Sequence, residues 1–201
     1  MLKIVESPDP RLAQVCEPCD VNDASLKRLS KQMAALMYKN AGCGIAAPQV
    51  GVNKRIIVID VDWDGDKGER NPIVLVNPEI VELQGEPEPG GEGCLSCPGV
   101  LLPVTRQPWA RVRYFDLEGD EWEIEGDGLL GRCLQHEIDH LEGKTLFETC
   151  DADVRIDALR AYEQARREGA KPGDTHIEVG MERVYALQDE KDAAEASETE
   201  E

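Results

Sequence analysis

The chain has 201 residues, of which 41% are hydrophobic, so it can form one domain with a sizeable core. Its formal net charge of −19 argues against direct binding to DNA or to a membrane surface, because both require a basic protein surface. No apolar run approaches the roughly 20 residues of a membrane span. The odd number of seven cysteines, in a chain large enough not to need disulfides, predicts a cytoplasmic protein with reduced thiols.

The first half of the chain predicts an arm, a helix and two strand regions. Acidic residues and prolines interrupt residues 1–15, which is not the pattern of a signal peptide. A helix begins near residues 22–23 and ends near residues 42–44, because apolar residues between them recur at helical spacing. The segments 54–60 and 72–83 are rich in β-branched residues and predict strands.

The second half predicts further strands and two helices. Glycine and proline indicate a loop at residues 84–93, and strands follow at 100–106 and 110–126, the second as a hairpin. A helix then runs from Asp127 to Gly143. Its apolar stripe consists of Leu130, Leu134, Ile138 and Leu141. Another helix is expected at 152–168.

The last part of the chain is strongly acidic. Residues 174–201 hold ten Asp or Glu against one Arg and one Lys. We therefore expect residues 169–201 to be an acidic, mostly disordered tail, with at most one short apolar strand around residues 176–187, outside a folded domain of residues 1–168.

Two of the three histidines of the chain lie in the segment HEIDH. On a helix, His136 and His140 are only about 40° apart around the axis, so both imidazoles can bind one metal ion. Glu137 lies next to that face, where a carboxylate can transfer protons without being a ligand. The segment therefore predicts a metal-dependent hydrolytic site.

The residue types alone leave the third ligand open. The protease pattern HExxHxxGxxH matches at Gly143 but places Leu146, which cannot bind metal, at its last position. Glu163 stands at roughly the distance at which another peptidase class supplies a glutamate. Cys94 follows a glycine-rich loop and could supply a thiolate. A metallopeptidase and a cysteine-ligated hydrolase both stay open at this point.

Three segments together resemble the peptide deformylases. They are GCGIAAPQVG at residues 42–51, EGCLS at 92–96 and QHEIDH at 135–140, in the order and with the approximate spacing of that family. The resemblance covers roughly residues 1–168, which would then be a deformylase-like catalytic domain. It implies an α+β fold with antiparallel strands around a central helix that carries the HExxH motif, and with further helices toward both ends.

The resemblance implies a metal site and an activity. Cys94, His136 and His140 would be the metal ligands, with a water molecule at the fourth position. Fe2+ is the expected ion, and Zn2+, Ni2+ or Co2+ also suit this donor set. The activity would be removal of the N-formyl group from the N-terminal formylmethionine of nascent polypeptides, with release of formate.

Three further residues would carry the chemistry. Glu137 would take a proton from the attacking water and deliver it to the leaving amine. The side chain of Gln49 and the backbone N–H of Leu95 would donate hydrogen bonds to the oxyanion.

The substrate site is predicted in two places. Gly44 and Ile45 would pair with an N-formylmethionyl peptide through their main chain. Leu129 and Cys133, one or two turns before the first histidine, would form walls for the methionine side chain, although ordinary core positions explain each equally well. The ribosome is a transient partner at most.

The chain departs from the family pattern at Cys97, where many relatives carry an aliphatic residue. A second thiol three residues from Cys94 leads to the hypothesis that the two form a disulfide when the metal is lost. A plain apolar filler is the alternative. A non-enzymatic protein that binds partners through its acidic tail is disfavoured, because Gln49, Glu137 and all three ligand residues are present.

Overall fold

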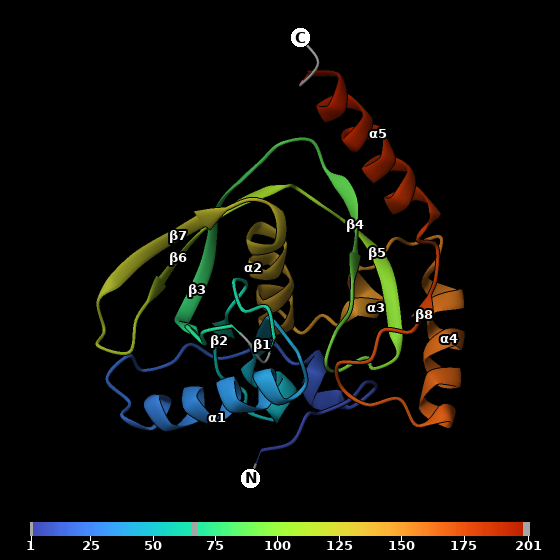
Figure 1. Ribbon diagram of the computed structural model, residues 1–201. Coiled ribbons are helices and arrows are strands. Elements are labelled where there is room, and N and C mark those ends of the chain that lie inside the picture. Colours follow the sequence, from blue (N-terminus) through green and yellow to red (C-terminus); the bar gives the residue numbers. More distant parts are fainter. Residues whose placement is uncertain (1, 66–67, 199–201) are drawn as a thin grey trace.

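Two sheets lie on either side of one helix in the computed structural model, which describes residues 2–65 and 68–198 (Figure 1). The larger sheet is antiparallel and has the order β1–β2–β3–β6–β7. Its strands are β1 Gly44–Ala46, β2 Ile56–Ile59, β3 Ile73–Gln84, β6 Trp109–Phe115 and β7 Glu121–Gly126. The smaller sheet has the order β4–β5–β8, with β8 parallel to β5. Its strands are β4 Glu88–Glu92, β5 Val100–Arg106 and β8 Ile177–Glu178.

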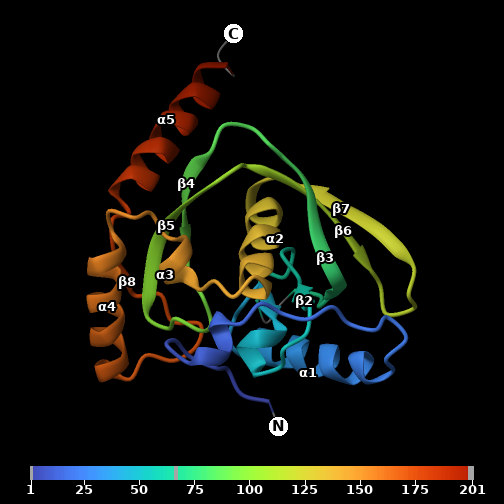
Figure 2. The ribbon, with the colours of Figure 1, turned by 180° about the vertical axis from the view of Figure 1, so that it is seen from behind.

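One helix fills the space between the sheets, and others pack at the β1–β2 end of the larger sheet and on the outside of β5, as the view from behind also shows (Figure 2). The α-helices are α1 Ser25–Lys39, α2 Gly128–Leu141, α3 Leu146–Thr149, α4 Arg155–Glu168 and α5 Glu182–Glu198, with 3-10 turns η1 Pro10–Ala13 and η2 Ala47–Val50. This arrangement confirms the predicted α+β class with antiparallel strands. No helix among the described residues has the length and apolar character needed to cross a membrane.

The helix between the sheets, α2, carries both histidines of the HEIDH segment. Its apolar stripe packs on the larger sheet, where Leu134 and Leu141 are completely buried. Their neighbours in this cluster include Ile57, Leu75 and Val112. Burial of each such side chain contributes about 1.5–3 kcal/mol, so the packing fixes the rotation of α2 about its axis. The directions of His136 and His140 follow from that rotation.

One predicted loop is partly a strand. Residues 88–92, within the glycine- and proline-rich segment, form β4 and pair with β5 from Glu88↔Arg106 to Glu92↔Leu102. Proline and glycine lower the local tendency to form a strand, but an edge strand tolerates Pro89 and the neighbouring strand supplies the hydrogen-bond partners. The prediction of a loop was wrong here because the pairing depends on a distant part of the sequence.

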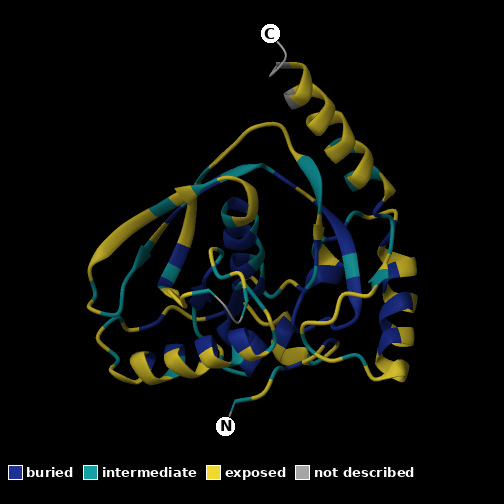
Figure 3. Cartoon of the chain, viewed as in Figure 1, coloured by how far each residue is buried: buried dark blue, intermediate teal, exposed yellow. Residues whose placement is uncertain are grey.

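The chain after α4 differs from the expected disordered tail. Residues 174–179 run along β5, where Gly99 N–H donates to Asp174 O (2.7 Å), Ile177 N–H to Gly99 O (2.9 Å) and Val179 N–H to Leu101 O (3.1 Å). Met181 is buried. The helix α5 then projects away from the sheets with a mostly exposed surface (Figure 3). The short strand expected around residues 176–187 is present as β8, but the composition does not reveal where it packs, because its partners are main-chain groups of β5.

We expect the packed segment and α5 to differ in their contribution to stability. A chain that ends at residue 181 should unfold at nearly the same urea concentration as the full chain. A chain that ends at residue 169 loses three main-chain hydrogen bonds, each worth about 0.5–1.5 kcal/mol, and a buried methionine worth about 1.5–3 kcal/mol. Its free energy of unfolding, measured by circular dichroism, should fall by about 3 kcal/mol or more. Equal unfolding midpoints for the two truncated chains would contradict this.

Candidate active site

One thiol and two imidazoles meet between the sheets. The ligand atoms of Cys94, His136 and His140 all lie within 4.8 Å of one another. Cys94, in the loop after β4, places its Sγ 3.3 Å from His140 Nε2. Glu163, the alternative third ligand, is exposed on α4 and pairs with Arg167 instead. The structure therefore brings together the cysteine-containing set and not the peptidase-like one.

The surroundings of Cys94 favour the deprotonated thiolate. A hydrogen bond from the Cys97 thiol lowers the pKa of Cys94 well below its usual range, and the neighbouring histidines add to this against the effect of burial. Thiolate is the form of cysteine that binds metal. Cys97 itself is completely buried, and its N–H donates to Cys94 O at 2.9 Å. The hypothesis of a Cys94–Cys97 disulfide stays a prediction.

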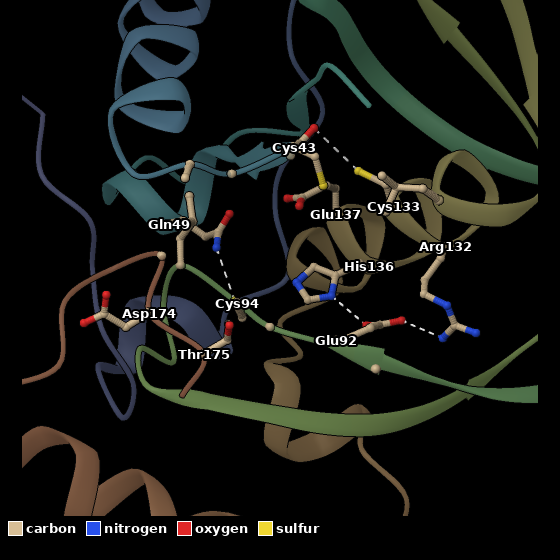
Figure 4. A pocket seen from close by; sticks show the side chains of 18 residues that line it. Cys43, Gln49, Glu92, Cys94, Arg132, Cys133, His136, Glu137, Asp174 and Thr175 are labelled. Atoms are coloured by element: carbon tan, nitrogen blue, oxygen red, sulfur yellow. Dashed lines mark hydrogen bonds and ion pairs between the residues drawn. The ribbon is translucent and has the colours of Figure 1, made fainter. Parts of the chain in front are cut away.

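A buried carboxylate orients the first histidine. Glu92, at the end of β4, accepts a hydrogen bond from His136 Nδ1 at 2.8 Å, which leaves Nε2 of that ring for a ligand (Figure 4). Two arginines neutralise the same carboxylate: Arg106 Nε at 2.6 Å and Arg132 at 2.9 Å. Although burial acts to raise it, the hydrogen bond from His136 and the Arg106 charge hold the pKa of Glu92 at about 2.

Glu137 has an unusual environment for a carboxylate. It is buried, and its Oε2 has no hydrogen-bond partner among the described residues. Burial raises the pKa of Glu137 to about 7, opposed by the charges of the two histidines. A carboxylate with a pKa near neutrality can both accept and return a proton. An unpaired buried oxygen also points to a donor that is absent from the protein itself, as expected beside a metal site with bound water.

The predicted oxyanion donors lie at the same place. Gln49 Oε1 accepts a hydrogen bond from Ala46 N–H at 2.8 Å, which turns its Nε2 toward Cys94 Sγ (3.4 Å) and Ser96 Oγ (3.3 Å). The main-chain N–H of Leu95 has no partner within residues 2–65 and 68–198. The Leu95 N–H is therefore available to a ligand, whereas Gln49 Nε2 donates to Cys94 and Ser96 and must exchange one of these bonds to reach a ligand.

A pocket of about 210 Å³ opens next to these groups. Of the predicted substrate residues, Gly44, Leu129 and Cys133 line it. Leu129 is 54% exposed and lies at the surface, whereas Cys133 is buried. Ile45 does not line the pocket, because the alternation along β1 directs its side chain into the core beside α1, where it is completely buried.

Gly44 leaves space for the carboxylate of Glu137. A Cβ atom at this position would lie 2.4 Å from Glu137 Oε1 and 2.8 Å from Cys133 Sγ. Only a residue without a side chain fits between β1 and α2. The glycine therefore positions Glu137 as well as lining the pocket.

Several residues of the site carried no signal in the sequence analysis. Glu92 stands in the EGCLS motif, but its partners lie on two other elements, β5 and α2. Cys43 lines the pocket as the variable residue of the G-x-G motif. Residues 173–175 also line it, although they lie in the predicted tail. The sequence does not indicate that residues 173–175 line the pocket, since they reach it only because the chain turns back along β5 after α4.

The comparisons with known proteins agree on one family. A family model described as polypeptide deformylase matches residues 1–155. The peptide deformylase of Hahella chejuensis is 50% identical over 143 residues, which cover 71% of this chain and 83% of that protein. The crystal structure of a peptide deformylase from Legionella pneumophila has a TM-score of 0.76 and 42% sequence identity, and covers 84% of this chain and 96% of that one. A peptide deformylase from Synechococcus elongatus in complex with actinonin has a TM-score of 0.73 and 38% identity, and covers 81% and 85% of the two chains.

We expect Glu92→Gln to weaken metal binding by about 10–100-fold, because the amide removes the charge that orients His136. Competition with a chelator, followed by metal analysis, measures this. Glu88→Gln, on the same strand but paired with Lys191 at the surface, is the matched control and should bind metal normally. Circular dichroism of both variants separates a local effect from unfolding. Unchanged metal affinity in a folded Glu92→Gln protein would remove the orienting role.

Proposed function

The chain belongs to the peptide deformylase family and is a hydrolase that removes the N-formyl group from nascent polypeptides, and we propose that Cys94, His136 and His140 are its metal ligands. The proximity of these three ligand atoms is the observation that carries the proposal. The depressed pKa of Cys94 and the hydrogen bond between His136 and Glu92 support it. We propose Fe2+ as the ion, while one thiolate and two imidazoles also suit Zn2+, Ni2+ and Co2+.

When bound, the ion supplies Lewis acidity and lowers the pKa of a water molecule toward neutrality. Glu137 takes the proton of the attacking water and then delivers it to the amine that leaves. Its pKa of about 7 suits both transfers, since the group must be a base first and an acid afterwards. Formate and a peptide with a free amino terminus are the products.

Hydrogen-bond donors of this chain stabilise the charge that develops on the formyl oxygen. Gln49 Nε2 is held in direction by the bond from Ala46 N–H to its Oε1, and the Leu95 N–H lies beside Cys94 in the same loop. Donors that are already oriented require little reorganisation during the reaction, which is why such groups contribute several kcal/mol.

The peptide itself is bound by main-chain groups and by the pocket. β1 is the edge strand of the larger sheet, so the outer edge of Gly44 is free to pair with an extended peptide. Leu129 and Cys133 form walls for the methionine side chain. We place this reaction in the cytoplasm with at most transient contact with the ribosome, since the substrate is a nascent chain and a net charge of −19 opposes tight binding to ribosomal RNA.

Glu137→Gln tests the proton transfer. The amide keeps the shape of the side chain but cannot accept a proton, so formate release from a formyl-Met peptide should fall by about 10²–10⁴-fold while the metal stays bound. Glu163→Gln, an exposed position on α4, is the control and should keep full activity. Near-normal turnover of a metal-replete Glu137→Gln protein would refute the assigned role.

Gly44→Ala tests the positioning of the same carboxylate. The added methyl group displaces Glu137, and misplacement of a reacting group by about 1 Å can cost about 10²-fold in rate. Gly42→Ala is the matched control, since its methyl group would lie 3.1 Å from the movable end of the Leu95 side chain and at an ordinary contact distance of 3.5 Å from Gly44 O, and should cost much less. The two kcat/KM values, measured at equal metal content, should differ by at least tenfold. Similar values would show that the gap beside Gly44 does not matter.

A further inference from the structure

Two thiols in the pocket take no part in the chemical steps above, although Cys133 forms part of the wall for the methionine side chain. Cys43, just before β1, is half-buried, and Cys133 on α2 is buried, yet both line the pocket beside Glu137. Figure 4 shows their side chains directed toward one another across the gap between β1 and α2. Neither is a metal ligand in the proposed site.

The contact between these two residues is close. Cys133 Sγ lies 3.8 Å from Cys43 O, and a Cβ atom on the adjacent Gly44 would be 2.8 Å from the same sulfur. The side chains also share a hydrogen bond between their thiols, and this bond lowers the pKa of Cys43. A disulfide requires sulfur atoms that can approach to about 2.05 Å with little movement of the backbone. Two thiols that share a hydrogen bond, with one sulfur 3.8 Å from the main-chain oxygen of the other residue, lie in the range from which that approach starts.

We propose that Cys43 and Cys133 are an oxidation site, and that a hydroperoxide small enough to enter the pocket converts them into a reversible disulfide. The Cys43 thiolate attacks the peroxide, the O–O bond breaks, and a sulfenic acid forms with release of water from hydrogen peroxide. The Cys133 thiol then attacks that sulfur and expels a second water. Two thiols lose two electrons and two protons, and one peroxide becomes two waters.

The disulfide blocks the site because the gap between β1 and α2 has no spare room. A Cβ atom added at Gly44 would already lie 2.4 Å from Glu137 Oε1. Even the small shift of Cys43 and Cys133 that the S–S bond requires therefore disturbs the fit between Gly44 and this carboxylate. It also changes the wall that we assign to the methionine side chain. The loss of activity rests on the proposed function, whereas formation of the disulfide does not.

The other cysteines are distinct from this pair. Cys97 is completely buried and does not line the pocket, and Cys94 is engaged by the metal in the loaded enzyme. Cys150 is buried in a separate cluster with α3 and α4. Among the thiols within the described residues, a peroxide in the pocket of the metal-loaded enzyme therefore meets those of Cys43 and Cys133 before those that do not line it.

The test uses the full chain loaded with Zn2+, which undergoes no redox reaction with peroxide. After treatment with hydrogen peroxide, free thiols are alkylated, and the digest is analysed by mass spectrometry. We expect a cross-linked peptide containing Cys43 and Cys133, the loss of two alkylatable thiols, unchanged zinc content and at least a tenfold loss of formate release. Dithiothreitol should restore the activity.

Two variants make the result specific, each compared with its own untreated sample. Cys43→Val should form no cross-link and show no loss that dithiothreitol reverses, while Cys150→Ser, the control, should behave as the original chain. Absence of the Cys43–Cys133 cross-link, or an equal reversible loss in Cys43→Val, would overturn the proposal. Mass spectrometry detects the cross-link independently of enzyme activity. If the assigned function is wrong, the untreated protein is inactive but the disulfide still forms.

Discussion

A single buried carboxylate, Glu92, joins the parts of the molecule on which the site depends. It lies on β4 and binds Arg106 on β5 as well as His136 and Arg132 on α2. A buried charge is tolerated only when it is fully paired, and removal of one partner of such a group typically costs about 3–5 kcal/mol. The helix with both histidines and the loop with Cys94 are therefore held together by an interaction that also fixes the direction of one imidazole.

The two sheets position different parts of the site. The larger sheet buries the apolar side of α2 and so fixes its rotation. The smaller sheet delivers Cys94 from the end of β4, with its own core formed against α3 and α4. The site lies where these two separately packed parts meet. Most of its polar groups pair with one another, whereas Glu137 Oε2 has no hydrogen-bond partner among the described residues. The polar and charged groups of the site lie at this boundary because burying them inside either apolar core would cost free energy.

The sequence was most informative where a property is local. Periodicity predicted α1, α2 and the β6–β7 hairpin, since the spacing of apolar residues reflects one element at a time. The three motifs predicted which residues come together. The sequence could not indicate β4, which depends on pairing with β5, or the roles of Glu92 and Arg106, which depend on burial. The burial of the Ile45 side chain also depends on the strand pairing, since one step along a strand reverses the direction of a side chain, and the predicted main-chain role of Ile45 stays a prediction.

The wall formed by residues 173–175 has a consequence for the order in which the protein is made. The segments with Gly44, Cys94 and His136 leave the ribosome first, and each can join its sheet or helix as soon as its neighbours are present. The last wall of the pocket follows only after α4 has been synthesised and the chain has turned back along β5. During its own translation the protein thus holds its chemical groups before it holds a closed binding site, and the pocket takes its final shape only once residues 173–175 have been made.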